Sequence, residues 1–84
     1  MPSIFVLDVP EFLPLVEHAK GMPTWCVDGP RTGYWRIHHV EKLEFDRKAL
    51  GFKPAVWHGA LTGGFLGRIT RLDNDRLVIE SEAK

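Results

Sequence analysis

The last third of the chain carries the pattern that most constrains its fold. Residues 55–62 and 65–72 have the composition of strands and are separated by Gly63-Gly64, a pair able to adopt the positive φ values of a tight hairpin turn. Residues 76–80 form a further apolar run after Asp73-Asn74-Asp75, whose side chains favour turns. The sequence therefore predicts three antiparallel strands joined by two hairpins.

Residues 62–80 resemble the glycine-marked hairpin found in many SH3-like barrels. In such hairpins a glycine a few residues before an apolar strand lets the sheet bend sharply, and Gly67 stands at that position. The resemblance covers under a quarter of the chain. It implies a small, strongly curved sheet, and a likeness of fold alone implies no function.

The N-terminal part predicts one strand and one helix. Residues 4–7 are apolar, but the run is too short for a membrane span and lacks the basic flank of a signal peptide, so it predicts a strand. Asp8 is a candidate helix cap and Gly21 a helix stop, and the regular helix is expected to begin near Phe12 because of Pro14. The apolar residues at helical spacing are Phe12, Leu15, Val16 and Ala19.

The middle of the chain predicts a long loop followed by strands. Residues 22–33 contain two prolines and two glycines without any apolar period, which indicates a loop. Residues 34–40 are rich in β-formers, and Leu43 and Phe45 resume the alternation, as in two short strands or one bulged strand. The fold expected over residues 1–84 is one α+β domain, mostly β. It is a small, strongly curved antiparallel sheet, SH3-like or a similar small barrel, with one short N-terminal helix packed on it.

Composition narrows the classes of partner and compartment. A hydrophobic fraction of 44% is typical of a globular chain, and eleven basic side chains balance eleven acidic ones, which argues against nucleic acid as a partner. The single cysteine, Cys26, cannot form an internal disulfide, so a cytoplasmic location is expected, with no membrane contact. A chain of this size buries only roughly 60–65% of its unfolded surface, which favours stabilisation by a C2 homodimer.

Three functions are compatible with the sequence, and none has a motif that fixes a reaction. The favoured one is a non-enzymatic binding or assembly module that forms a homodimer. The second is a small enzyme or small-molecule-binding protein with a pocket between residues 22–33 and the sheet. The third is a small barrel that binds nucleic acid through Arg68, Arg71 and Arg76. The net charge of zero makes this hypothesis weaker than the other two.

The candidate ligand site combines a cation, an anion and two indoles. Trp25, Asp28 and Arg31 lie close together in the expected loop, where a rigid sheet would position them. The guanidinium would hold a carboxylate or phosphate, and the site is expected to face Trp57 or His58 on the strand beneath.

Metal ligation and nucleophilic catalysis are not expected. His38 and His39 are adjacent, so on a strand they point to opposite faces and do not easily share a metal ion. A free cysteine such as Cys26 is more often a buried, inert thiol than a nucleophile. The sequence therefore predicts no metal, no cofactor and no catalytic residue, while a role for Cys26, His38, His39 or His58 stays open.

Overall fold

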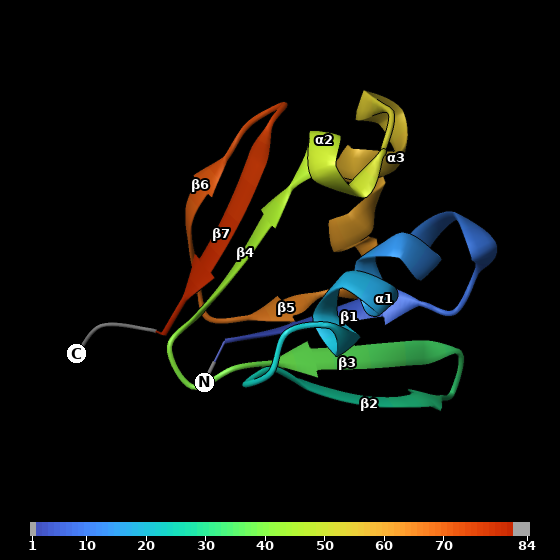
Figure 1. Cartoon of the computed structure of the whole chain (residues 1–84), viewed down its shortest axis with the longest axis vertical. Helices are drawn as coiled ribbons and strands as arrows, with labels where there is room; N and C mark the ends of the chain where they lie inside the picture. Colours follow the sequence, from blue (N-terminus) through green and yellow to red (C-terminus); the bar gives the residue numbers. More distant parts are fainter. Residues whose placement is uncertain (1, 82–84) are drawn as a thin grey trace.

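Two antiparallel sheets organise residues 2–81, the part of the chain that the computed structural model describes (Figure 1). The four-stranded sheet has the order β2 (Cys26–Arg31), β3 (Tyr34–His38), β1 (Ser3–Leu7) and β5 (Phe65–Leu66). All its neighbouring strands pair antiparallel. The strand predicted at residues 4–7 is thus confirmed as a central strand of this sheet.

The three-stranded sheet has the order β4 (Lys42–Asp46), β7 (Arg76–Glu80) and β6 (Arg68–Leu72), again antiparallel. The strands predicted on either side of residues 39–41 are therefore two strands, β3 and β4, and they belong to different sheets. The hairpin predicted around residues 73–75 is confirmed as the connection of β6 and β7.

Helix α1 (Leu13–Lys20) covers one face of the four-stranded sheet (Figure 1). The predicted apolar spacing and the start near Phe12 are confirmed, with a 3-10 turn at Pro10–Phe12 before the helix. Asp8 does not cap it: its carboxylate Oδ1 instead accepts a hydrogen bond from Trp35 Nε1 at 3.0 Å. The side chains packed between this helix and the sheet include Leu15, Val16, Ala19, Ile4, Val6 and Ile37.

Residues 55–62 form helix, so the prediction of a strand there, and of a hairpin at Gly63-Gly64, is wrong. The segment folds as α3 (Pro54–Gly59) and the 3-10 turn Ala60–Gly63. Pro54 stands in the first helical turn, where its fixed φ and missing N–H are tolerated. Trp57 and Ala60 are both buried, at the i, i+3 spacing of one helix face. Tertiary burial of that face outweighs the strand composition of the segment.

Gly67 is the place where the chain passes from one sheet to the other, between β5 and β6. Its φ of 118° is a conformation that favours glycine, and a Cβ there would lie 2.6 Å from the carbonyl oxygen of Glu80. A sharp bend at this residue, as predicted, is therefore present. The two described sheets do not close into a barrel, so the expected SH3-like barrel is not confirmed, whereas a small α+β fold with more strand than helix is.

The predicted loop at residues 22–33 is largely a strand, because residues 26–31 pair with β3 as β2. β2 is an edge strand, and an edge is where a sheet tolerates proline. The register shifts between Asp28 and Arg31, around Gly29 with its φ of 115°. The glycines and prolines that suggested a loop therefore mark an irregular sheet edge.

A second short helix, α2 (Arg47–Leu50), follows β4 directly, and its N-cap is Asp46, whose carboxylate accepts from the backbone N–H of Lys48 and Ala49. None of the helices within residues 2–81 has the length and apolar character needed to cross a membrane.

The carboxylate of Asp73 stabilises the β6–β7 turn and should make the stability of the fold dependent on pH. It accepts hydrogen bonds from Arg71 Nε and from the backbone N–H of Asp75 and Arg76, each at 2.8 Å. These donors, the Arg71 side chain first, lower the pKa of Asp73 from 3.8 to about 2.

A depressed pKa means that the contribution of Asp73 is present above pH 3.8 and is lost as the pH falls toward about 2. We therefore expect the melting temperature of the unmodified chain to fall more steeply across this window than that of the Asp73→Asn variant. Thermal unfolding followed by circular dichroism between pH 2 and 5 measures it. The exposed Glu11→Gln variant is the control, and equal slopes for Asp73→Asn and the unmodified chain would contradict the assignment.

Candidate functional site

The structure separates the five residues of the predicted ligand site into three places. Asp28 and Arg31 line one pocket on the four-stranded sheet, and Trp25 lines a second hollow. Trp57 and His58 line neither of these two. The single shared site expected from the sequence is therefore not assembled, and only its charged pair stays together.

Trp57 and His58 are instead partners of the β6–β7 turn. The Trp57 side chain is 2% exposed, and its Nε1 donates to the backbone carbonyl of Asp73 at 2.7 Å. His58 Nε2 lies 3.0 Å from Oδ1 of Asn74. Because residues 55–62 are helical, these side chains point toward the turn rather than lying on a strand beneath Asp28 and Arg31.

Trp25 packs among aromatic rings at the end of α1. Its ring centroid lies 5.4 Å from that of Phe45, 5.8 Å from His18 and 6.2 Å from His39. The hollow beside it, of about 470 Å³, extends along β4 to Glu44, Asp46 and Arg76. Arg76 already pairs with both of these carboxylates, at 2.8 and 3.5 Å. The charges of this hollow are thus largely satisfied within the protein.

The pocket that holds Asp28 and Arg31 lies on the face of the four-stranded sheet away from α1. Side chains alternate along a strand, so burial of Ile4 and Ile37 under α1 places Phe5 and Arg36 on the other face. Arg36 lies opposite Phe5 of β1 on one side and opposite Asp28 of β2 on the other.

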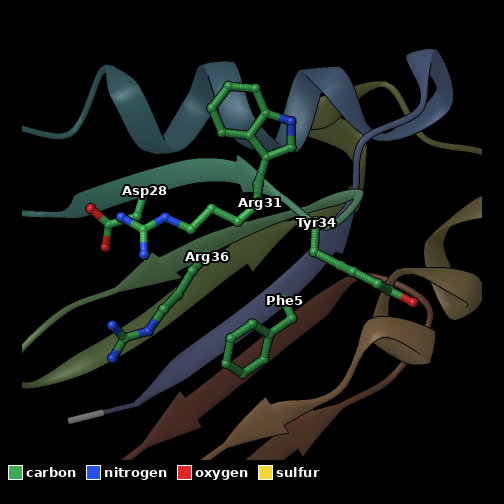
Figure 2. Close-up of a pocket in the computed structure, with 6 residues that line it drawn as sticks. Phe5, Asp28, Arg31, Tyr34 and Arg36 are labelled. Atoms are coloured by element: carbon green, nitrogen blue, oxygen red, sulfur yellow. The ribbon is translucent and has the colours of Figure 1, made fainter.

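We call this hollow the sheet-face pocket, and its volume is about 310 Å³. Arg31 and Tyr34 join it from the end of the β2–β3 hairpin, where they are paired across the strands. In Figure 2, the side chains of Arg31 and Arg36 extend toward the same end as Asp28, Tyr34 extends toward the opposite end, and Phe5 lies between. The sheet-face pocket is lined by Phe5, Asp28, Arg31, Tyr34, Trp35 and Arg36.

The sheet-face pocket carries two guanidinium groups without a carboxylate partner. Of the four other arginines, Arg47, Arg71 and Arg76 each form an ion pair with an aspartate or glutamate, and Arg68 is exposed on β6. Within residues 2–81, neither Arg31 nor Arg36 lies within ion-pair distance of any carboxylate. Arg36 is moreover half-buried, and removing a cation from water is unfavourable unless an anion compensates it.

Asp28, the one acidic residue of the lining, is bonded to a histidine. Its Oδ2 lies 3.0 Å from Nε2 of His38, whose side chain is only 13% exposed. Beside it Ser3 is paired with His38 across β1 and β3, and Ser3 Oγ and His38 Nδ1 are both buried without a hydrogen-bond partner among residues 2–81. Asp28 therefore pairs with His38 and with neither arginine, although it lies at the same end of the pocket, and two guanidinium groups face a single carboxylate there (Figure 2).

The structure also places the cysteine and the histidine whose functional role the sequence does not decide. Cys26 is exposed, so the expectation of a buried thiol is wrong, and it lies opposite His38 across β2 and β3. His39 Nε2 lies 3.1 Å from Thr24 Oγ1. No three histidine, cysteine, aspartate or glutamate side chains among the described residues are grouped so as to hold a metal ion.

The predicted site lacked four of the lining residues, Phe5, Tyr34, Trp35 and Arg36. The signal for them was the strand alternation itself: Arg36 is out of phase with the apolar Ile37, and Phe5 is out of phase with Ile4 and Val6. The alternation shows which face of a strand Phe5 and Arg36 occupy. It does not place them beside Asp28 and Arg31 unless residues 26–31 are known to be a strand of the same sheet. Comparison of the sequence with models of known protein families and with curated proteins finds no match.

Proposed function

We propose that this chain is a small, non-enzymatic binding module that takes an anionic small molecule in the sheet-face pocket. The observation that supports the proposal most strongly is the pair of guanidinium groups of Arg31 and Arg36, which share one pocket and have no carboxylate partner in the described part of the chain.

Two guanidinium groups are suited to a carboxylate, sulfate or phosphate. Each presents N–H donors in a planar fork that matches two oxygens of such a group. Arg36 lies on β3 between β1 and β2, so the backbone that carries its side chain is fixed by pairing on both sides. Arg31 is exposed at the end of β2 and closes the pocket from the side.

The proposal predicts that sulfate or inorganic phosphate binds saturably and stabilises the fold. Isothermal titration at constant ionic strength measures affinity, and melting temperature measures stabilisation, because a ligand that binds only the folded state raises it. A hydrogen bond to a charged group is worth about 1.5–3 kcal/mol, so Arg36→Gln and Arg31→Gln are each expected to weaken binding at least about tenfold.

Arg68→Gln is the matched control for these variants. Arg68 is exposed on β6 of the other sheet and lines neither described hollow, so the change removes the same charge elsewhere. Its affinity for the anion should stay within about twofold of the unmodified chain. An equal loss for all three variants, or no saturable binding of any oxyanion, would refute the proposed site.

Self-association is the second candidate function, and one observation favours it. Strand β5 is a free edge of the four-stranded sheet, and its two side chains, Phe65 and Leu66, are 38% and 55% exposed. Apolar side chains on an open edge are a surface on which a second copy can pair. Sedimentation at tens of micromolar tests it: a dimer lost in Leu66→Lys supports it, and a monomer throughout rejects it.

A further inference from the structure

The sheet-face pocket has an aromatic part beside its charged part. Phe5 lies on the central strand β1, and Tyr34 on the neighbouring β3 is paired with Leu7, two residues further along β1. The two aromatic residues are therefore diagonal neighbours on one sheet face, about 7–8 Å apart or somewhat less.

These two rings differ from the other aromatic side chains of the fold. Phe12 packs against Phe52, and Trp25 packs against Phe45 and two imidazoles. Across residues 2–81, neither Phe5 nor Tyr34 stacks with another ring, and Tyr34 is 37% exposed. Tyr34 packs beside Gly63, where an added Cβ would lie 3.0 Å from its Cε1, and Phe5 is half-buried. What the two residues offer a planar ligand group is the part of each that lines the pocket.

The charged and aromatic parts are arranged end to end. The guanidinium groups of Arg31 and Arg36 lie toward one end of the pocket, Tyr34 lies toward the other, and Phe5 is between them (Figure 2). A bare oxyanion would occupy only the charged end. A ligand that satisfies the whole pocket carries an anionic group and, a few ångströms from it, a planar ring.

The volume of the sheet-face pocket and the carboxylate of Asp28 agree with such a ligand. The pocket measures about 310 Å³, at the lower end of the roughly 300–1,000 Å³ of small-molecule sites. Asp28 lies at the charged end (Figure 2) and uses Oδ2 toward His38, so its Oδ1 is placed to accept a hydrogen bond from a sugar hydroxyl next to the bound phosphate. A phosphate, a hydroxylated sugar and a planar base are the three parts of a nucleotide.

We propose that the ligand of the sheet-face pocket is a nucleotide unit, with its phosphate on Arg31 and Arg36 and its base over Phe5 and Tyr34. The inference rests on the proposed anion site and specifies the chemistry of its ligand. Such a unit has two sources, a free mononucleotide and a single-stranded nucleic acid. Only two unpaired arginines line the pocket, so it holds one or two phosphates and does not track a long backbone.

The test is a titration series that adds one part of the ligand at a time. Inorganic phosphate, ribose 5-phosphate, the four common nucleoside monophosphates and a short single-stranded oligonucleotide are titrated into the unmodified chain at constant ionic strength. Stacking of one base is worth about 1–3 kcal/mol. At least one nucleoside monophosphate should therefore bind about fivefold or more tightly than ribose 5-phosphate.

Phe5→Leu removes the ring and keeps an apolar side chain, and Phe65→Leu is its matched control. Phe65 is an exposed phenylalanine of the same sheet that does not line the pocket. Phe5→Leu should lose most of the advantage of the nucleotide over ribose 5-phosphate while keeping its affinity for inorganic phosphate, which also shows that it is folded. Phe65→Leu should keep both affinities.

The outcomes separate this inference from the proposed function. If phosphate binding depends on Arg31 and Arg36 but the base adds no affinity, the nucleotide inference is wrong and the anion site stands. If no phosphate compound binds in a manner that depends on these arginines, both are wrong. A base advantage lost in Phe5→Leu supports the inference. The oligonucleotide identifies the source: tighter binding than the best mononucleotide indicates nucleic acid, and equal or weaker binding indicates a free nucleotide.

Discussion

Replacing Trp57 with alanine is expected to lower the free energy of unfolding by about 3–5 kcal/mol, the range for removing a large aromatic side chain from a core. The indole is 2% exposed and belongs to the cluster that joins α3 to the three-stranded sheet. The change also leaves the carbonyl of Asp73 without its donor at 2.7 Å. The total free energy of unfolding of a native domain is only about 5–15 kcal/mol. A large fraction of the Trp57→Ala molecules should therefore be unfolded near room temperature in mild denaturant.

Conservative variants separate the packing of Trp57 from its hydrogen bond. Trp57→Phe keeps most of the ring and should lower the free energy of unfolding by about 1–3 kcal/mol, the penalty for an unsatisfied buried acceptor. Trp35→Phe is the control, because Trp35 also donates from Nε1, but to the exposed carboxylate of Asp8. Urea unfolding measures all three variants. A Trp57→Ala chain within about 1 kcal/mol of the unmodified protein would contradict the packing of α3 described above.

Replacing Gly63 with alanine is expected to lower the free energy of unfolding by about 3 kcal/mol or more. A Cβ at this position would lie 2.2 Å from the carbonyl oxygen of Phe5 and 3.0 Å from Cε1 of Tyr34. The nearest obstacle is backbone, which cannot rotate away, so η2 (Ala60–Gly63) must separate from β1. For a domain of this size, a loss of 3 kcal/mol corresponds to a fall in melting temperature of about 12–24 °C.

Gly59→Ala is the matched control for the Gly63 substitution. Gly59 lies in the same helical stretch with a φ of −75°, and a Cβ there would meet only Cζ of Phe12 at 3.8 Å, an ordinary contact. Alanine is the better helix former, so this variant should be as stable as the unmodified chain or slightly more stable. If Gly63→Ala and Gly59→Ala melt within about 4 °C of each other, the close approach of η2 to β1 is not as described.

The sequence predicts most of the strands of this fold because their alternation is visible in short windows. β1, β3, β4 and β7 each alternate or run apolar between turn signals, and α1 repeats at helical spacing. The prediction fails at residues 55–62, where strand-like composition competes with burial of Trp57 and Ala60 on one helix face. Strand formation in β2 is equally hidden, although β2 pairs with the adjacent β3 in a hairpin, because glycine and proline mask its strand pattern.

The same limitation applies to the site. Asp28 and Arg31 line one pocket because they are close in sequence and lie on one edge strand. Their partners, Phe5 and Arg36, come from strands whose neighbours in the sheet are set by tertiary pairing. Trp57 and His58 were expected there on the assumption of a strand that is a helix. A site formed by residues of three strands can therefore be predicted only when the order of those strands in the sheet is known.

The most direct measurement of the proposed anion site follows the arginine side chains themselves. In a ¹⁵N–¹H correlation spectrum, the Nε–Hε signals of Arg31 and Arg36 are recorded while sulfate replaces chloride at constant ionic strength. We expect these two signals to shift together and saturate with a single dissociation constant, while the signal of Arg68, exposed on the other sheet, stays in place. Shifts that do not saturate, or that are equal at all arginines, would contradict the proposed anion site.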